Sequence, residues 1–225
     1  MRKWSHDYPW GPIHNHMAYM DRSHVRVAGG KLVIRAVNER HPKATDTAQF
    51  TGRTLKVNYQ AGAVHTSGKF DFTHGYAEAR LKVPKGRGYW PAFWLLPTHS
   101  GWPPEIDVME ILTGNPHRSH VALHYGKDWR DHRSHGRWVE DLPDLSADFH
   151  DYGVHWTRDF IDFYFEGKRV HRVTDRAAIA HTDTPMYLII NLAVGGWEKT
   201  PDETTIWNGN FYETDWVRVW QARPK

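Results

Sequence analysis

Residues 104–112 read Pro-Glu-Ile-Asp-Val-Met-Glu-Ile-Leu, which places three acidic side chains within six positions. The apolar residues between and after the acids are typical of a buried strand. Carboxylates packed in such a strand repel one another and lose solvation, so the cluster costs stability. This cost indicates that the acids serve chemistry, and glycoside hydrolysis is a reaction that needs two close carboxyl groups.

The spacing of the acids conflicts with regular strand geometry. Successive side chains of a strand point to opposite faces, so Glu105 and Asp107 would share one face while Glu110 pointed into the core. One extra residue in a β-bulge near Val108 and Met109 would return Glu110 to the face of the other two. We therefore predict a bulge at this point.

The predicted bulge sets Glu105 and Glu110 a short distance apart on one strand, with Asp107 between them repelling charge on both. Retaining glycosidases hold their carboxyls roughly 5–5.5 Å apart, against roughly 6.5–9.5 Å in inverting enzymes, so the short span favours retention. A divalent cation bound by the three acids is the alternative. It is less favoured because acids that bind metals usually lie on loops that can wrap around the ion.

The rest of the chain predicts an all-β fold. Residues 24–36 have the pattern of a hairpin, residues 76–83 alternate, and residues 92–96 form a continuous apolar run typical of a buried strand. The best helix candidate is the short segment 174–181. Many short strands with Gly and Pro turns indicate an antiparallel sandwich or barrel, and we expect one domain over residues 1–225. The polar segment 127–151 is interpreted as a long surface loop.

Composition excludes several classes of protein. The 225 residues contain no cysteine, which excludes disulfides and thiol catalysis. The formal net charge is +3 with no basic block, so we expect no nucleic-acid partner. No apolar run approaches the length of a membrane span. Residues 1–7 lack the apolar stretch of a signal peptide, so either the protein stays inside the cell or its export signal has been removed. Of the two, we expect a secreted protein.

Aromatic residues make up 14 % of the chain, with 12 Trp, 10 Tyr and 9 Phe. Most of these rings are expected to fill the core. Some lie beside Gly or Pro where strands end, as at Trp90, Trp102 and Trp197. An exposed flat ring at such a place is a natural platform for the face of a sugar.

Four blocks of sequence carry a resemblance to a known family. Residues 105–110, Glu-Ile-Asp-Val-Met-Glu, resemble the signature of the family 16 glycoside hydrolases. The other matching blocks are residues 75–84 with 88–97, and the late blocks 191–197 and 215–220, which match in order and spacing. The resemblance implies a concanavalin A-like β-jelly roll, a sandwich of two antiparallel sheets with a concave substrate cleft. It also implies that catalysis requires no cofactor.

The resemblance also implies roles for the acids. Glu105 would be the nucleophile, Glu110 the general acid/base, and Asp107 the residue that tunes them. With the extra residue Met109, the signature resembles that of the bulged, laminarinase-like branch of the family. In that branch, endo-acting hydrolysis of β-1,3-glucan is the commonest activity. That branch also holds enzymes that cut agarose, carrageenan and porphyran.

Further site residues follow from the resemblance alone. The residues expected to contact sugar are Trp90, Trp94, Trp102, His124, Asn15, Arg80, Asn191 and Trp197. Trp94 could equally belong to the core, and Arg80 could instead pair with Glu78 or another acid on a strand. A structural calcium ion would use a residue near the amino terminus, the backbone carbonyl near Gly30 and the side chain of Asp215.

The main hypothesis is therefore a monomeric, retaining endo-glycosidase with a polysaccharide partner. Its substrate would be β-1,3-glucan of the laminarin type, with mixed-linkage β-1,3-1,4-glucan as a second substrate. One alternative is a family 16 galactanase, for which Arg80, Arg87 and the group Arg130, Arg133 and Arg137 could bind sulfate. Solvated charge on loops explains these arginines equally well. The other is a carbohydrate-binding jelly roll without catalysis.

Overall fold

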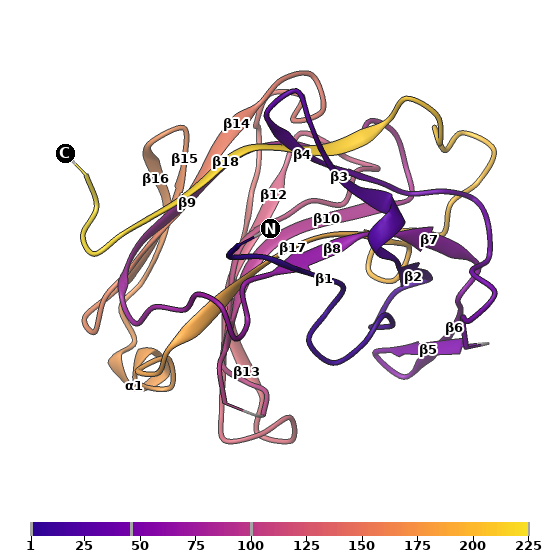
Figure 1. Ribbon diagram of the computed structural model, residues 1–225. Coiled ribbons are helices and arrows are strands. Elements are labelled where there is room, and N and C mark those ends of the chain that lie inside the picture. The colour runs from indigo at the N-terminus through magenta and orange to yellow at the C-terminus, as the bar shows by residue number, and fades with distance from the viewer. Residues whose placement is uncertain (1, 46, 100, 225) are drawn as a thin grey trace.

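The computed structural model describes residues 2–45, 47–99 and 101–224. Two seven-stranded antiparallel sheets make up most of it (Figure 1). We call the first the cleft sheet. Its strands, in spatial order, are β1 (Ser5–His6), β8 (Ala63–His65), β17 (Met186–Val194), β10 (Tyr89–Pro97), β11 (Glu105–Glu110), β12 (Ser119–Tyr125) and β13 (Arg133–Val139).

The second sheet, called the outer sheet, packs against the first. Its strands, in spatial order, are β16 (Lys168–Val173), β15 (Ile161–Phe165), β14 (His150–Trp156), β9 (Gly75–Lys82), β18 (Phe211–Trp220), β4 (Lys31–Arg35) and β3 (Val25–Ala28). This arrangement confirms the predicted all-β sandwich. The hairpin of β3 and β4 and the buried strand β10 confirm two of the predicted elements.

Small elements complete the described structure. The parallel pair β2 (Ala18–Met20) and β7 (Tyr59–Ala61) and the hairpin β5 (Thr47–Phe50) and β6 (Arg53–Lys56) form two-stranded sheets, and β5 and β6 lie at the edge of the molecule (Figure 1). A short 3-10 helix, η1, spans Arg22–His24. The predicted helix is confirmed as α1 (Arg176–Ala180), whose N-cap Asp175 accepts hydrogen bonds from Ala177 and Ala178.

The core lies between the two sheets because alternate strand residues point inward. On β9 the inward side chains are Ala77, Ala79 and Leu81, all fully buried, while Arg80 between them points outward. Each large apolar side chain buried in this way contributes about 1.5–3 kcal/mol to stability. The opposite face of the cleft sheet is then free to carry polar side chains. No helix in the described part of the chain is long and apolar enough to cross a membrane.

The interpretation of residues 127–151 as a surface loop was wrong for residues 133–139, which form β13, and for residues 150–151, which begin β14. Strand β13 pairs with β12 along its whole length, from Ser119 opposite Val139 to Tyr125 opposite Arg133. It is the edge strand of the cleft sheet and is mostly exposed or half-buried. An edge strand tolerates a polar, charged sequence, which hid the strand pattern here.

Candidate active site

A β-bulge on β11 places the three acids on one face. Phe93 of β10 pairs with Met109 and Trp94 pairs with Asp107, so Val108 has no partner on β10. On the β12 side the register also shifts between Asp107 and Glu110. The predicted bulge is therefore confirmed. It lets Val108 and Met109 stay buried while Glu105, Asp107 and Glu110 all line the same cleft.

The cleft has a volume of about 810 Å³ and lies over β17, β10 and β11. Its floor carries Trp90, Trp94 and Asn191, and the segment of residues 8–16 contributes a wall. Of the described residues that line it, none is Lys or Arg. The three carboxyl groups therefore meet aromatic and neutral polar groups rather than cationic side chains.

Glu105 lies at the start of β11. Its Oε2 accepts a hydrogen bond of 2.9 Å from Trp102 Nε1, and its Oε1 lies 3.9 Å from His124 Nε2. Burial raises the pKa of Glu105 well above its ordinary value, and the charge of Asp107 raises it further, while His124 acts in the opposite direction. The bond from Trp102 orients this carboxyl group and leaves Oε1 free of that bond.

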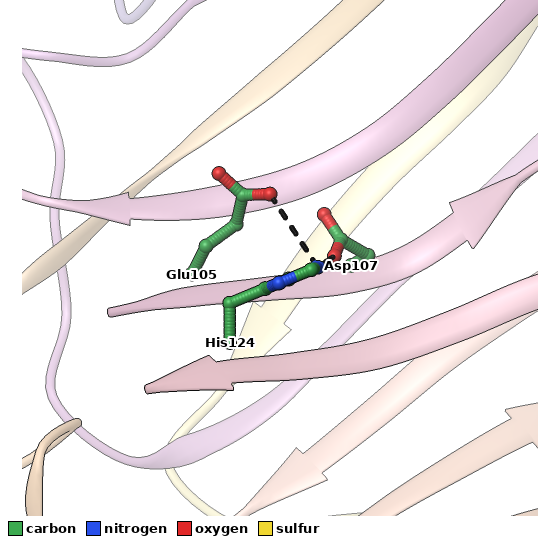
Figure 2. Close-up of side chains that lie close together, drawn as sticks. All are labelled: Glu105, Asp107 and His124. Atoms are coloured by element: carbon green, nitrogen blue, oxygen red, sulfur yellow. Dashed lines mark ion pairs between the residues drawn. The ribbon is translucent and has the colours of Figure 1, made fainter. Parts of the chain in front are cut away.

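Asp107 is the most buried of the three acids, with 2 % of its surface exposed. Its Oδ2 lies 2.9 Å from His124 Nε2. Figure 2 shows Glu105, Asp107 and His124 converging on one point above neighbouring strands. Burial raises the pKa of Asp107 well above its usual range, and the nearby charge of Glu110 adds to this. A proton is therefore easily held within the cluster.

Glu110 ends β11 and is held from both sides. Trp90 Nε1 donates a 3.0 Å hydrogen bond to Oε1, and His120 Nδ1 lies 3.2 Å from Oε2. His120 comes from β12, directly opposite Glu110 in the register. The ring of Trp197 contacts both Trp90 and His120, with centroids 5.7 and 5.1 Å away. The two acids at the ends of β11 thus have different partners, as two different roles would require.

The structure brings together most of the residues predicted to contact sugar. The residues that line the cleft are Asn15, Trp90, Trp94, Trp102 and Asn191. Trp94 satisfies both interpretations, because its ring is largely buried yet lines the cleft floor, and its Nε1 donates a 2.7 Å hydrogen bond to Asn191 Oδ1. His124 and Trp197 adjoin the cleft through their contacts with Asp107 and Trp90.

The prediction that Arg80 contacts sugar in the cleft was wrong. Arg80 lies on β9 of the outer sheet, between inward-facing Ala79 and Leu81, and so points away from the cleft sheet. Its Nη1 lies 3.1 Å from Asp151 Oδ1, and its Nε lies 3.9 Å from Asp215 Oδ2. The other interpretation, a pair with a strand acid, is the one that the structure shows.

The contact between Arg80 and Asp215 also bears on the expected calcium ion. Calcium takes six to eight oxygen ligands, and the expected set of Asp215, the carbonyl near Gly30 and a residue near the amino terminus supplies only part of them. The Arg80 guanidinium lies near the half-exposed Asp215, and in the described part of the chain no group of three His, Asp or Glu ligand atoms forms there. Calcium also binds backbone carbonyls and water, so the calcium site stays a prediction.

Several residues of the site were missed from the sequence. The wall formed by Tyr8, Trp10 and His14 comes from an irregular segment, for which no strand pattern exists. His120 could have been found, because it shares a strand face with His124. His132 and Trp138 were hidden by the interpretation of residues 127–151 as a loop. His132 Nε2 lies 2.7 Å from His124 Nδ1, and the ring of Trp138 lies 5.0 Å from that of His120.

Comparison with known proteins gives consistent matches. The model of the family described as glycosyl hydrolases family 16 matches residues 17–218. Endo-1,3-1,4-beta-glycanase ExsH of Rhizobium meliloti (strain 1021) is 37 % identical over 169 residues, which cover 72 % of this chain and 34 % of that protein. Glucan endo-1,3-beta-glucosidase A1 of Niallia circulans is 31 % identical over 233 residues, covering 95 % of this chain and 33 % of that one.

A solved structure gives a similar match. The endo-beta-1,3-glucanase from Pyrococcus furiosus superposes with a TM-score of 0.81 and 32 % identity, over 97 % of this chain and 88 % of that one. The chain described here spans only about a third of the length of the two curated relatives.

Proposed function

The chain belongs to glycosyl hydrolase family 16, and from this premise we propose that it is a retaining endo-glycosidase that hydrolyses β-1,3-glucan. Mixed-linkage β-1,3-1,4-glucan is its second proposed substrate. The observation that carries the proposal is the bulge at Val108, which sets Glu105 and Glu110 on one face of one strand, on the floor of an open cleft. The names of the relatives support the same class of substrate.

The proposed mechanism is double displacement. Glu105 attacks the anomeric carbon while Glu110 protonates the leaving glycosidic oxygen, which forms a covalent glycosyl-enzyme and releases one part of the chain. Glu110, now a carboxylate, then takes a proton from water, and this water cleaves the glycosyl-enzyme and frees Glu105. Trp102 orients the nucleophile, and Trp90 and His120 orient the acid/base. Glycosyl hydrolases of this family act without a cofactor in catalysis.

The lining of the cleft supports a neutral glucan over a sulfated galactan. Sulfate groups are best bound by Arg, and the described cleft lining contains no Arg or Lys. Arg87 instead pairs with Asp202, and Arg133 pairs with Asp131. The alternative of a binding protein without catalysis has no specific observation in its favour, because all three acids are present and both Glu105 and Glu110 are oriented by hydrogen-bond donors.

Three expectations accompany this proposal. The substrate is too large to enter a cell, so an extracellular location suits the activity. A single catalytic domain over residues 1–225 and a monomeric state are also proposed. Size-exclusion chromatography of the purified chain would test the last of these, with elution near 26.3 kDa as the expected result.

The test is a reducing-sugar assay on laminarin, lichenan, curdlan, agarose and carrageenan, with sizing of the products. We expect laminarin to be cut into oligosaccharides of several lengths, and Glu105→Gln to abolish this cleavage while the circular dichroism spectrum is unchanged. The matched control is Glu203→Gln, because Glu203 is exposed and lies outside the cleft. Turnover at the wild-type rate in Glu105→Gln would overturn the mechanism, and cleavage of a galactan with laminarin intact would overturn the substrate.

A further inference from the structure

Three side chains of the cleft have the arrangement of a metal-binding site. Glu105 and Asp107 each offer a carboxylate oxygen and His124 offers a ring nitrogen, and these ligand atoms all lie within 4.8 Å of one another. His124 Nε2 is 2.9 Å from Asp107 Oδ2 and 3.9 Å from Glu105 Oε1. Figure 2 shows the three groups pointing toward one another from one side of the sheet.

These separations suit a single ion. Zinc binds His nitrogen and carboxylate oxygen at roughly 2.0–2.2 Å, so two adjacent ligands of one zinc ion lie about 3–3.5 Å apart. The distance from His124 to Asp107 already falls close to this range. Glu105 is longer and less buried than Asp107, so a movement of its carboxyl group toward the other two ligand atoms would complete the set.

The buried oxygen of Asp107 points independently to a bound cation. Its Oδ2 is shielded from solvent and accepts no hydrogen bond from any described residue, although Asp107 is 98 % buried. The nearby Nε2 of His124 is close enough for such a bond but does not make one. Two potential ligand atoms 2.9 Å apart with no hydrogen bond between them can occupy adjacent positions around one ion. An unsatisfied buried carboxylate oxygen is costly, and a cation would offset that cost.

The surroundings of His124 match those of a metal ligand. A histidine that binds a metal through one nitrogen normally uses the other nitrogen in a hydrogen bond that fixes its orientation. His124 Nδ1 is engaged in this way by His132 Nε2 at 2.7 Å. The ring of His132 also packs against Trp102, with centroids 4.5 Å apart, so the supporting residue is itself held in place.

We propose that Glu105, Asp107 and His124 bind one Zn²⁺ ion, and that this ion inhibits hydrolysis because it occupies the nucleophile. The imidazole favours zinc over magnesium and calcium, which prefer all-oxygen sites. The two carboxylates balance the charge of the ion, and no Lys or Arg of the described cleft lining competes with it. The three side chains leave a coordination position open toward the cleft for water. Binding is independent of the proposed function, whereas inhibition rests on it.

Isothermal titration calorimetry of the chelator-treated chain with zinc chloride at neutral pH tests the site directly. We expect one ion per chain. His132→Ala should weaken binding by about 10–100-fold, since it removes a supporting residue, and His124→Ala should weaken it more. The matched control is His135→Ala, because His135 Nε2 also lies 3.1 Å from a carboxylate oxygen, that of Asp175, but has no third ligand. Zinc affinity should be unchanged in this control.

Binding that is undetectable in the wild-type chain would overturn the proposal, as would binding that survives unchanged in His124→Ala. Magnesium and calcium chloride serve as further probes, and binding of either more tightly than zinc would also overturn it. Because His132 lies on the exposed hairpin between β12 and β13, its variant keeps the test valid if His124→Ala fails to fold.

The hydrolysis assay on laminarin supplies the second measurement. Zinc should inhibit in competition with laminarin, a chelator should restore the rate, and His132→Ala should need about 10–100-fold more zinc for the same inhibition. If zinc binds as described but the chain has no hydrolytic activity, the proposed function is wrong and the metal site still stands. Hydrolysis that is unaffected by saturating zinc would sink the inhibitory role.

Discussion

Two buried aspartates, one on each sheet, show opposite electrostatics. Asp162 on β15 of the outer sheet and Asp107 on β11 of the cleft sheet are 1 % and 2 % exposed. Arg172 donates two hydrogen bonds to Asp162, and Arg169 and Tyr164 contact it as well. Burial alone would raise the pKa of Asp162, but the hydrogen bonds and charge of Arg172 outweigh it and lower the pKa.

Asp107 has the same burial without such a partner. Its nearest ionisable neighbours are other carboxyls and the imidazole of His124, and burial together with Glu110 raises its pKa. The difference teaches that burial of an acid does not by itself identify a site. An acid neutralised by Arg stabilises the fold, whereas an acid left among other acids is a cost that only chemistry explains.

After loss of Glu105, the largest effect on hydrolysis is expected from loss of Glu110, whose partners hold it for proton transfer. Glu110→Gln should lower the rate of laminarin hydrolysis by about 10²–10⁴-fold, because general acid catalysis contributes about that much. An aryl glycoside with an acidic leaving group needs no protonation, so its first cleavage step should be much less affected. Single-turnover kinetics on both substrates would measure this. Equal losses on both substrates would contradict the acid/base role. They would also remove the contrast between the acids of the cleft, which serve catalysis, and Asp162, which serves stability alone.

The stability of the chain should respond in opposite directions to loss of the two aspartates. Asp162→Asn should lower the free energy of unfolding by about 1–3 kcal/mol, since it weakens hydrogen bonds to a charged group. The half-exposed Arg172 can be rehydrated, which keeps the loss moderate. Asp107→Asn should raise the free energy of unfolding by about 1 kcal/mol at neutral pH. It removes a carboxyl group whose raised pKa shows that the ionised form is disfavoured in the folded chain. Urea unfolding of both variants gives the two values.

The dependence on pH separates the same two variants. The lowered pKa of Asp162 contributes stability above its unfolded value near 4, and this is lost as pH falls through the folded pKa. The raised pKa of Asp107 does the reverse, so its penalty grows as pH rises from about 4 through the folded pKa. Asp107→Asn should therefore reduce the decline in the free energy of unfolding as the pH rises toward neutral. An unchanged decline in this variant would show that Asp107 carries no such penalty.

The sequence predicted the cleft acids well because all three lie in one strand, where burying three carboxyl groups costs stability. Three acids lie there among buried apolar residues, and strict alternation of strand faces would place Glu110 on the wrong face by one residue. This local pattern led to Glu105, Glu110 and the bulge at Val108. Arg80 was misplaced because its role was taken from the family resemblance alone. The alternation of its own strand, in which Ala79 and Leu81 face the core, would have placed its side chain on the outer face. His132 could not be found, since its role depends on a contact with His124 across a hairpin on an edge strand.

The smallest effect concerns Gly136 of β13, which lies opposite Ala122 on the edge of the cleft sheet. A Cβ at this position would meet His120 Nε2 at 2.9 Å, so Gly136→Ala must displace the ring that contacts Glu110 by a few tenths of an ångström. Because a misplacement of about 1 Å can cost about 10²-fold in rate, a few-fold loss of kcat is expected. Initial rates on laminarin would measure it.

A double-mutant cycle shows whether the effect of Gly136→Ala passes through His120. In a His120→Ala background the added methyl group has no ring to displace, so Gly136→Ala should have no further effect on kcat. A full additional loss in that background would place the effect elsewhere on β13 and would separate Glu110 from His120. Asp162 is again the contrast, since its partners lie on the outer sheet and neither variant should change the free energy that Asp162→Asn removes.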